Sequence, residues 1–356
     1  MYFIFVIILF FAQKSSQEIQ TAIETVIKEQ ELVGTQAAIM LKGEIIYKHS
    51  WGLANQAFSV PVTDDTRFLI ASITKAITGH AIHILQYEGL IDLDKPIQTY
   101  LPDFPKKSEK AITIRLLLNH RSGVRHYFRG ETDNAQFFDA NYETATAALE
   151  KFKNDSLLFE PDTGMQYSSF GYTILAAIVE QVKKCSFREY LQTELFSPNS
   201  LSHIDVPDWR YPVKNLASSY SFFLGHLGAT NSEPFEARRL NFSYNAGGGN
   251  LVSNSLDLLK LGSEIFKSFK ENKPMYSDIV ASGIPGYAYG WNLDRDENAR
   301  LVFNATGASE AYQGALTVWP DQDLLIVTLS NTWGKNSRQG GFTLSLAKTI
   351  ASIILD

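Results

Sequence analysis

Cysteine is nearly absent from the sequence, since Cys185 stands alone among 356 residues. A single cysteine excludes an internal disulfide framework and any cysteine-rich metal site. Cys185 follows the string EQVKK near the expected end of a helix, and nothing in the sequence places it beside a histidine as a nucleophile. We interpret it as a half-buried structural thiol.

Runs of basic residues are also missing. The chain has 32 Lys and Arg against 38 Asp and Glu, a formal net charge of -6, and no Lys/Arg-rich segment. This balance argues against nucleic acid as a partner. With 45% hydrophobic and 20% charged residues, the composition is that of a globular protein. The length permits one large domain or two lobes that share a cleft.

Several metal-binding and catalytic signatures are absent. There is no H-E-x-x-H or G-x-S-x-G string, and the glycine-rich AGGGN at 246–250 lacks the Lys and Ser/Thr of a phosphate-binding loop. His80 and His83 lie three residues apart, and His120 and His126 flank RSGVR, but a metal site needs a third ligand. We expect helix-surface or loop histidines, no metal and no organic cofactor, and interpret AGGGN as a tight turn that lines a cleft.

The N-terminus carries an apolar run, Tyr2 to Ala12, followed by polar residues. That length suits the hydrophobic region of a signal peptide and is short for a membrane span. Positive charges before the run are missing and the cleavage pattern is poor, so an uncleaved membrane anchor is the alternative. We predict a leader over residues 1–16 and entry into the secretory pathway, with a membrane as partner only if the leader is uncleaved.

Strand patterns gather at the two ends of the sequence. TQAAIMLKGEIIYKHSWGLAN near the start predicts a β-hairpin that turns at Lys42-Gly43. GALTVWPDQDLLIVTLSN near the end predicts a second one that turns at Pro320 to Gln322. The simplest assembly pairs the two ends of the chain into one antiparallel sheet flanked by helices.

The middle of the sequence has helical periodicity instead. Helices are expected at 72–88 and from Ser255, which is a plausible N-cap. We therefore predict an α/β lobe from about 17–70 and 285–356, a mostly helical lobe over about 71–284, and a cleft between them.

The spacing Ser-x-x-Lys occurs twice. Ser72 and Lys75 lie in FLIASITKAITGHAIHILQ, which has the composition of a buried helix, and Ser345 and Lys348 lie in LSLAKTI near the C-terminus. Two residues three apart share one face of a helix. The second pair lies on an amphipathic terminal helix with no other polar cluster nearby, so we interpret its spacing as chance.

A lysine beside Ser72 has a chemical use. Serine is a poor nucleophile until a base takes its proton. Lysine is such a base when burial and neighbouring cations lower its pKa until the free amine is populated. The weakly polar residues around Ser72 and Lys75 provide this setting, although spacing alone leaves a structural interpretation open.

Tyr167 and Ser169, in FEPDTGMQYSSFGYTILAAIVE, precede a strongly apolar helix and can point from a loop into a cleft. A phenol whose proton is labile near lysine-type cations can relay protons to a leaving group. A tyrosine packed at the start of a helix gives the same pattern. The string alone leaves both interpretations open.

Thr306, Gly307 and Ala308, in FNATGASEAYQGALTVWP, open an apolar strand. Glycine there allows close approach of a ligand to the backbone. An exposed N–H on this strand would form a two-donor oxyanion hole together with the N–H of Ser72. A glycine at a strand bend is the alternative.

In this order SITK, YSS and ATG resemble the three motifs of the serine β-lactamase and penicillin-binding-protein superfamily, on its class C and esterase side. Those motifs are S-x-x-K, Y-x-N or Y-S-T, and K-T-G or H-T-G. Other family-like strings are LIDLDKPIQTYLPDFP, LLLNHRSGVRHY, NAGGGNLVSNSLDLLKLG and YAYGW. SGVRHY, FKNDSLLFEP and YSSFGYTILAAIVE are similar in particular to the mitochondrial serine β-lactamase-like proteins of animals. The resemblance covers nearly the whole chain after the leader.

This resemblance implies a β-lactamase-related domain over 17–356, with an α/β sandwich, a helical lobe and the active site in the cleft between them. By the same resemblance Ser72 is the acylated nucleophile, Lys75 its general base and Tyr167 the proton relay to the leaving group. Ser169 takes the polar, substrate-contacting position.

The third motif implies the oxyanion hole. By resemblance, the backbone N–H groups of Ser72 and Ala308 form it, on a strand that also brings Thr306 and Gly307 to the substrate. The sequence departs from the family here, because Ala305 stands where the motif carries Lys or His. Loss of that cation costs on the order of a hundredfold in rate, and less for a neutral ester or amide than for a substrate with a carboxylate. Ser169 in place of Asn or Thr is a smaller change, since it keeps a hydroxyl.

Two functions remain open at this point. The first is a serine hydrolase that forms an acyl-enzyme at Ser72 with an ester or a peptide-like amide, its partner being a small molecule or peptide. The second is a catalytically weak or inactive homologue with a binding or filament-forming role, as a homo-oligomer. The resemblance also makes a mitochondrial location the alternative to secretion.

Overall fold

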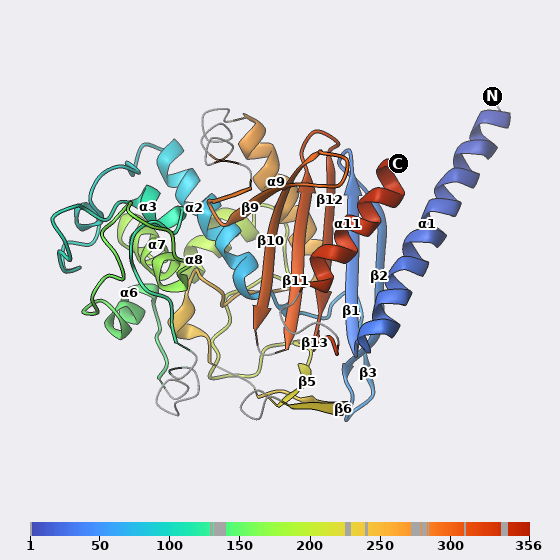
Figure 1. The fold of residues 1–356 in the computed structure, drawn as a ribbon, viewed down its shortest axis with the longest axis horizontal. Coiled ribbons are helices and arrows are strands. Elements are labelled where there is room, and N and C mark those ends of the chain that lie inside the picture. The colour runs from blue at the N-terminus through green and yellow to red at the C-terminus, as the bar shows by residue number, and fades with distance from the viewer. Residues whose placement is uncertain are drawn as a thin grey trace.

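The computed structural model describes residues 2–128, 131, 140–224, 229–238, 241–271, 279, 283, 285–309, 311–335 and 341–356. Within these residues, eight strands form one antiparallel sheet (Figure 1). In their order across the sheet the strands are β3 (Val60–Pro61), β2 (Glu44–Asn55), β1 (Gly34–Leu41), β12 (Leu324–Ser330), β11 (Tyr312–Trp319), β10 (Leu301–Ser309), β9 (Trp291–Arg295) and β8 (Gly286–Ala288).

The two ends of the chain meet in the middle of this sheet. β1 pairs with β12 in a register that sets Ile39 opposite Ile326. β1 and β2 form the first expected hairpin, and β11 and β12 form the second. The first hairpin turns through Lys42 and Gly43, whose φ angles of 52° and 83° are those of a tight hairpin turn. The antiparallel sheet expected from the terminal segments is confirmed.

Helices cover both faces of the sheet. α1 (Tyr2–Gln30) and α11 (Phe342–Leu355) pack on one face, where Ile23 and Ile350 belong to one apolar cluster with the strands. α9 (Ser255–Glu271) packs on the other face, against β1 and β12. No helix in the part of the chain that the structure describes is long and apolar enough to cross a membrane.

The middle of the chain forms a mostly helical lobe beside the sheet, at the left of Figure 1. Its α-helices are α2 (Thr74–Tyr87), α3 (Ile114–Leu118), α6 (Ala145–Ala148), α7 (Ser169–Lys183) and α8 (Phe187–Leu191). Short 3-10 or π turns accompany them: η1 (Ala71–Ile73), η2 (Ile97–Thr99), η3 (Leu149–Lys151), η4 (Gln192–Phe196) and η5 (Ser243–Asn245).

Two small sheets complete the fold. The first contains β13 (Thr332–Trp333), β5 (Tyr220–Leu224) and β6 (Ala229–Glu236), and the second contains β4 (Phe68–Leu69) and β7 (Val252–Ser253). The architecture is therefore the expected α/β sandwich with a helical lobe. The residue boundaries drawn for the leader and for the two lobes stay predictions.

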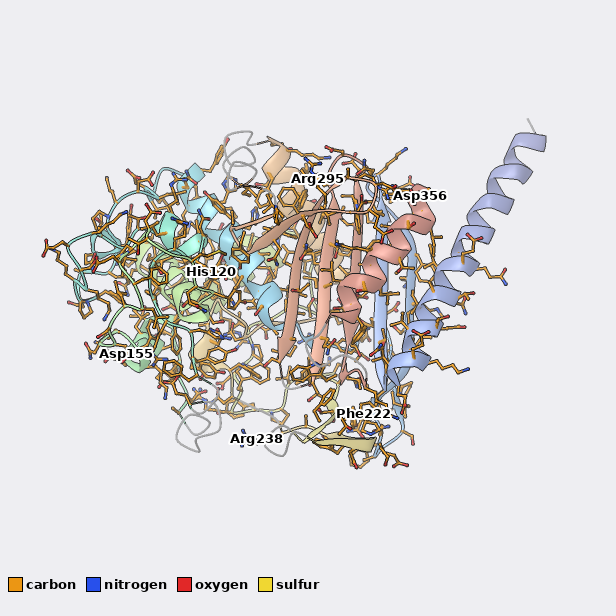
Figure 2. The ribbon with its side chains drawn as sticks, in the orientation of Figure 1. His120, Asp155, Phe222, Arg238, Arg295 and Asp356 are labelled. Atoms are coloured by element: carbon orange, nitrogen blue, oxygen red, sulfur yellow. The ribbon has the colours of Figure 1, made fainter. Side chains whose placement is uncertain are left out.

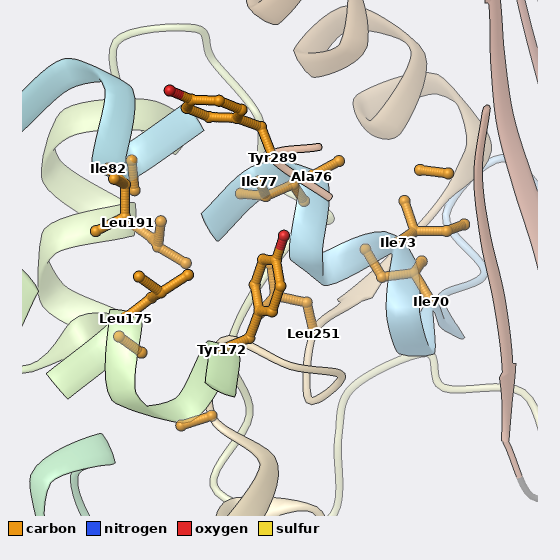
Figure 3. Close-up of a cluster of buried hydrophobic side chains, with 14 of the residues drawn as sticks. Ile70, Ile73, Ala76, Ile77, Ile82, Tyr172, Leu175, Leu191, Leu251 and Tyr289 are labelled. Carbon is orange, nitrogen blue, oxygen red and sulfur yellow. The ribbon is translucent and has the colours of Figure 1, made fainter. Parts of the chain in front are cut away.

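α2 lies at the junction of the lobe and the sheet. Figure 3 shows its apolar side chains against those of α7, and η1, immediately before it, beside the sheet. The packing is tight enough to require glycine, because a Cβ at Gly79 would lie 2.2 Å from the carbonyl oxygen of Tyr289. The N-terminal half of α2 is thereby held against the segment that carries Tyr289.

The cap of α9 differs from the sequence-based expectation. Ser255 is the first helical residue, and the side chain that caps the helix belongs to Asn254, whose Oδ1 accepts the N–H of Asp257 at 2.8 Å. Asparagine is among the strongest capping residues, and it satisfies an N–H that has no partner within the helix.

The expectation that His80 and His83 lie on a helix surface is wrong. Their side chains are 5% and 3% exposed and pack against the ring of Phe269. Burial, with a contribution from the neighbouring His83, lowers the pKa of His80 to about 3, and burial lowers the pKa of His83 to about 4. The two imidazoles are neutral members of the core.

Candidate active site

The candidate site begins at a strained turn before α2. Ser72 lies in η1, next to Ala71, whose φ of 44° falls in the left-handed region that non-glycine residues rarely adopt. Ala71 is buried while Ser72 stays half-buried. Strain of this kind persists where the surrounding structure enforces it, and it clusters at functional sites.

Lys75 follows in the first turn of α2 and is fully buried. Its Nζ lies 3.3 Å from Ser72 Oγ, 2.9 Å from Ser169 Oγ and 2.5 Å from the carbonyl oxygen of Gly248. Burial lowers the pKa of Lys75 well below its ordinary value, because a low-dielectric environment disfavours the ammonium. The serine and lysine that share a helical face in the sequence are therefore also in contact in the fold.

The three contacts of Lys75 fit a neutral amine. A neutral amino group has two N–H donors and one lone pair. The carbonyl of Gly248 can only accept, and Ser169 Oγ accepts the second N–H. The lone pair is then left for the hydroxyl proton of Ser72, which is the arrangement that a general base requires.

Gly248 belongs to the AGGGN turn, which the sequence placed along the cleft. The turn approaches α2 and α7 closely, since a Cβ at Gly248 would lie 2.9 Å from the carbonyl oxygen of Ser169. The neighbouring carbonyl of Gly247 accepts the hydroxyl of Thr78 at 2.7 Å. The turn therefore supplies backbone acceptors to α2.

Tyr167 reaches the serine from the loop before α7, and its Oη donates a hydrogen bond to Ser72 Oγ at 2.7 Å. Lys75 Nζ lies 4.7 Å from the centre of the same ring. Burial raises the pKa of Tyr167, and its interactions with Ser72 and Ser169 offset this rise only in part. The phenol therefore keeps its proton and is a donor to Ser72, in contrast to the labile phenol that the sequence suggested.

Ser169 lies beside the lysine, and its contact with a substrate stays a prediction. It is the first residue of α7 and is buried, with its hydroxyl on Lys75. Its hydroxyl also lies near enough to the phenol of Tyr167 to lower the pKa of that group. Ser169 thus connects the amine of Lys75 to the phenol of Tyr167.

The third motif approaches from β10. A Cβ at Gly307 would lie 2.1 Å from the carbonyl oxygen of Ile70 and 3.1 Å from the backbone nitrogen of Ser72, so only glycine lets the strand come this close. Ala308 is exposed and Thr306 is half-buried. The fold thereby brings the strand to the serine turn, and the role of the Ser72 and Ala308 N–H groups as oxyanion donors stays a prediction.

Ala305, at the position of the missing cation, is 1% exposed and belongs to the main apolar core together with Phe303. It lies two residues before Gly307, and residues two apart in a strand share one face of the sheet. The position of the family's Lys or His is thus filled by apolar packing beside the serine turn.

Two site residues, His120 and His126, were expected to be ordinary loop histidines. His120 is buried in the helical lobe (Figure 2), where its ring centre lies 4.5 Å from that of Tyr167. The ring centre of His126 lies 5.6 Å from the same tyrosine. Their only sequence signal was a position on either side of RSGVR, which carries no chemical spacing of its own. Across the described ranges, no three His, Cys, Asp or Glu side chains are grouped so as to hold a metal ion.

Comparisons with known proteins agree with this geometry. The family model named Beta-lactamase matches residues 19–347. Penicillin-binding protein 4* of Bacillus subtilis (strain 168) is 26% identical over 340 residues, which cover 90% of this chain and 72% of the relative. The mitochondrial serine beta-lactamase-like protein LACTB of Homo sapiens is 26% identical over 357 residues, 78% of this chain and 64% of the relative.

Solved structures share the fold. D-amino acid amidase from Ochrobactrum anthropi SV3, complexed with D-phenylalanine, matches with a TM-score of 0.79 and 21% identity over 95% of this chain and 99% of the other. The octameric penicillin-binding protein homologue from Pyrococcus abyssi matches with a TM-score of 0.76 and 23% identity over 95% of this chain and 77% of the other. The chain belongs to the beta-lactamase family, within the superfamily of β-lactamase and penicillin-binding-protein-type serine hydrolases.

Proposed function

We propose that this protein is a serine hydrolase that forms an acyl-enzyme at Ser72 with an uncharged ester or amide. The observation that carries the proposal is the placement of Lys75, buried and within 3.3 Å of Ser72 Oγ, with Tyr167 Oη 2.7 Å from the same oxygen. A nucleophile within hydrogen-bond reach of a base, and the base held by further groups, is the arrangement of nucleophilic catalysis.

The reaction takes place in two steps. Ser72 Oγ attacks the acyl carbon while its proton passes to Lys75 Nζ, and the bond to the leaving alcohol or amine then breaks. Tyr167 protonates the leaving group and regains a proton from Lys75 through the hydroxyl of Ser169, which contacts both side chains. Water attacks the acyl-enzyme in the second step, releasing the acid and free Ser72.

The developing negative charge on the acyl oxygen needs donors. The backbone N–H groups of Ser72 and Ala308 are proposed for this role, because Gly307 lets β10 pass within van der Waals reach of the serine turn. Preorganised N–H donors of this kind are often the largest single contribution to acyl transfer.

The charges around the site favour a substrate without a carboxylate. Ala305 provides no cation, and Arg125, the nearby guanidinium, is held by Glu131 and Asp155. His126 is neutral at pH 7, since burial lowers its pKa to about 4. A substrate carboxylate would therefore lose its hydration without gaining a counter-charge from position 305, Arg125 or His126.

A fluorophosphonate probe tests the acyl-enzyme. Incubation of the folded protein with the probe, followed by intact-mass measurement and peptide mapping, is expected to show one adduct at Ser72. Folded protein that takes no label would overturn the hydrolase function.

A second measurement tests the substrate class. The kcat/KM of a neutral p-nitrophenyl ester is expected to exceed the acylation rate constant for a penicillin, which bears a carboxylate. Ala305→Lys is expected to raise the penicillin rate at least tenfold relative to the ester. If the ratio of the penicillin rate to the ester rate is unchanged in a folded Ala305→Lys variant, the missing cation at position 305 does not explain the substrate preference.

A specific observation also favours a second function, that of a catalytically weak homologue kept for assembly. The cation position is filled by Ala305, and one structural relative is described as octameric. Analytical ultracentrifugation of wild type and of Ser72→Ala separates the two functions. A discrete oligomer in protein that takes no probe would favour assembly, and a labelled monomer would favour hydrolysis.

The location of the protein is proposed from the N-terminal sequence and from the relatives. The apolar run Tyr2 to Ala12 supports entry into the secretory pathway, and the mitochondrial relatives support a mitochondrial location as the alternative. Expression of the full chain with a C-terminal tag, followed by fractionation and N-terminal sequencing, distinguishes these locations and shows whether residues 1–16 are removed.

A further inference from the structure

The N-terminus of α7 is held by two imidazoles that come from another segment of the chain. The N–H of Ser168 donates to His120 Nδ1 at 3.2 Å, and the N–H of Ser169 donates to His126 Nδ1 at 3.1 Å. The first N–H groups of a helix have no acceptor within the helix. The two bonds therefore fix the backbone that carries the side chains of Tyr167 and Ser169.

Each bond requires a neutral imidazole in one tautomer. Nδ1 accepts a hydrogen bond only when it carries no proton, so the proton of the neutral ring is on Nε2. A protonated ring has two N–H donors and no acceptor, and its Nδ1–H would face the backbone N–H. Positive charge is also unfavourable at the N-terminus of a helix. Protonation of either ring therefore breaks its hold on the segment.

Both rings contact the phenol whose hydroxyl donates to Ser72. His120 lies among three tyrosine rings, with centre-to-centre distances of 4.5 Å to Tyr167, 5.3 Å to Tyr172 and 4.4 Å to Tyr287. His126 packs on Tyr127 at 3.8 Å and lies edge-on to Tyr167. The imidazoles thus position Tyr167 twice, through the backbone that follows it and through its ring.

The charged and titratable groups around the two rings oppose their protonation. Burial lowers the pKa of His120 well below its usual value, and a proton on Lys75 or on His126 would lower it further. Burial, Lys75 and Arg125 lower the pKa of His126 to about 4 against the opposing carboxylate of Glu131. The rings of Tyr172 and Tyr287 face His120, and the ring of Tyr127 faces His126. The neutral state is the one that the surroundings stabilise at pH 7.

We propose that His120 and His126 are positioning residues of the acyl-transfer site. As neutral imidazoles they hold the segment 167–169 in place. The phenol of Tyr167 then keeps its hydrogen bond to Ser72 Oγ, and the hydroxyl of Ser169 keeps its hydrogen bond with the amine of Lys75. This inference rests on the proposed hydrolase function. It predicts that acylation falls in acid when His126 takes a proton, and that this fall is absent when a non-titrating acceptor replaces the ring.

Two substitutions at His126 separate positioning from simple packing. His126→Asn places a non-titrating acceptor, the amide oxygen, near the position of Nδ1, and His126→Val removes the acceptor. Ester hydrolysis is measured from pH 3.5 to 8, with His83→Asn as a matched change of a buried histidine outside the site. Circular dichroism at each pH confirms that the variants stay folded.

In wild type we expect kcat to fall as the pH passes through about 4. His126→Asn is expected to restore most of the activity at pH 7 and to lack this fall. His126→Val is expected to lower kcat about tenfold to a hundredfold at pH 7, with KM little changed, because a displacement of about 1 Å at the reacting groups can cost that much. His83→Asn is expected to keep the wild-type profile. A folded His126→Val with wild-type kcat, or a His126→Asn with the wild-type acid fall, would overturn the proposal.

An activity-independent measurement keeps this inference distinct from the proposed function. Nitrogen-15 NMR of histidine-labelled protein, assigned with His120→Asn and His126→Asn, reports which ring nitrogen carries the proton. Both rings are expected to be Nε2–H tautomers at pH 7. If both rings are Nε2–H tautomers and the fluorophosphonate probe does not label the protein, the hydrolase function is wrong. The hydrogen bonds from the α7 backbone to the two imidazoles are then still supported. If either ring carries its proton on Nδ1 in a protein that takes the probe, the positioning role fails and the hydrolase function stands.

Discussion

The two Ser-x-x-Lys pairs of this chain have the same spacing and opposite surroundings. Ser72 and Lys75 lie at the junction of the two lobes, where the lysine is fully buried and its amine contacts the serine oxygen. Ser345 and Lys348 lie on α11, where the serine is exposed and donates to the carbonyl of Gly341, the N-cap of the same helix, at 3.1 Å.

The second lysine is turned away from its serine. Lys348 Nζ forms an ion pair with Asp294 Oδ2 at 3.1 Å, and both side chains are partly exposed. An ion pair with a carboxylate stabilises the ammonium, whereas burial without a counter-charge stabilises the amine. The comparison teaches that spacing places two side chains on one face of a helix and that the environment decides whether the lysine can act as a base.

The largest expected difference concerns the two serines. Ser72→Ala should abolish covalent labelling and lower ester hydrolysis on the order of 10⁴-fold or more, because it removes the hydroxyl proposed to form the acyl-enzyme. Ser345→Ala should leave both unchanged. Labelling with the fluorophosphonate probe and steady-state kinetics measure this. Equal labelling of the two variants would remove the distinction between the pairs.

The lysines should differ next. Lys75→Arg keeps a cation but removes a base that can be neutral near pH 7, since a guanidinium is not deprotonated in proteins. We expect kcat/KM to fall about 10²- to 10⁴-fold. Lys348→Arg keeps the ion pair to Asp294 and should have no effect on turnover. Retention of wild-type kcat/KM in Lys75→Arg would contradict its assignment as the base.

A pair of glycines sharpens the comparison in steric terms. Gly307→Ala would set a Cβ 2.1 Å from the carbonyl oxygen of Ile70, whereas a Cβ at Gly341, beside Ser345, meets nothing within 4 Å. Displacement of β10 from the serine turn should cost about 1–3 kcal/mol of unfolding free energy and lower acylation about a hundredfold. Gly341→Ala should leave acylation unchanged. Urea unfolding and probe kinetics on both variants test this, and a Gly307→Ala protein with normal acylation would show that the close approach is dispensable.

The smallest expected difference concerns stability in acid. The depressed pKa of His80, about 3 in the folded protein against 6.5 in the unfolded chain, means that the unfolded chain takes up a proton first as the pH falls. Stability is then fully present above pH 6.5 and is lost as the pH falls toward 3. At pH 4.5 the loss of stability from this group amounts to about 3 kcal/mol.

His80→Leu on α2 should therefore flatten the decrease in Tm between pH 7 and pH 4.5. Lys348→Leu on α11 removes a partly exposed ion pair and should leave the pH dependence as it is in wild type. Differential scanning calorimetry at the two pH values measures both. A Tm of His80→Leu that falls as steeply as that of wild type would mean that this imidazole does not take up a proton on unfolding in this range.

The terminal hairpins and the motif order were predictable because their signals are local. Alternation of apolar residues around Lys42-Gly43 and around Pro320 to Gln322 fixed two hairpins, and each formed as expected. Ser72 and Lys75 were readable for the same reason, since i and i+3 on a helix share a face in any fold.

The environment of the site was not predictable from these signals. The capping role of Asn254 instead of Ser255 depends on which residue takes the first helical dihedrals. The burial of His80 and His83 depends on the packing of α9 over α2. The local sequence pattern therefore predicts neither the capping by Asn254 nor the burial of the two histidines.

The sequence by itself determined the family, the order of the three motifs and the missing cation at Ala305. These are properties of residue type and spacing along the chain. Only the tertiary structure decided that Ser72, Lys75 and Tyr167 meet, that Ser169 connects the amine to the phenol, and that His120 and His126 hold the helix behind them. The physical reason is that a pKa and a hydrogen-bond partner depend on burial and on residues up to 173 positions apart in the chain, such as Lys75 and Gly248.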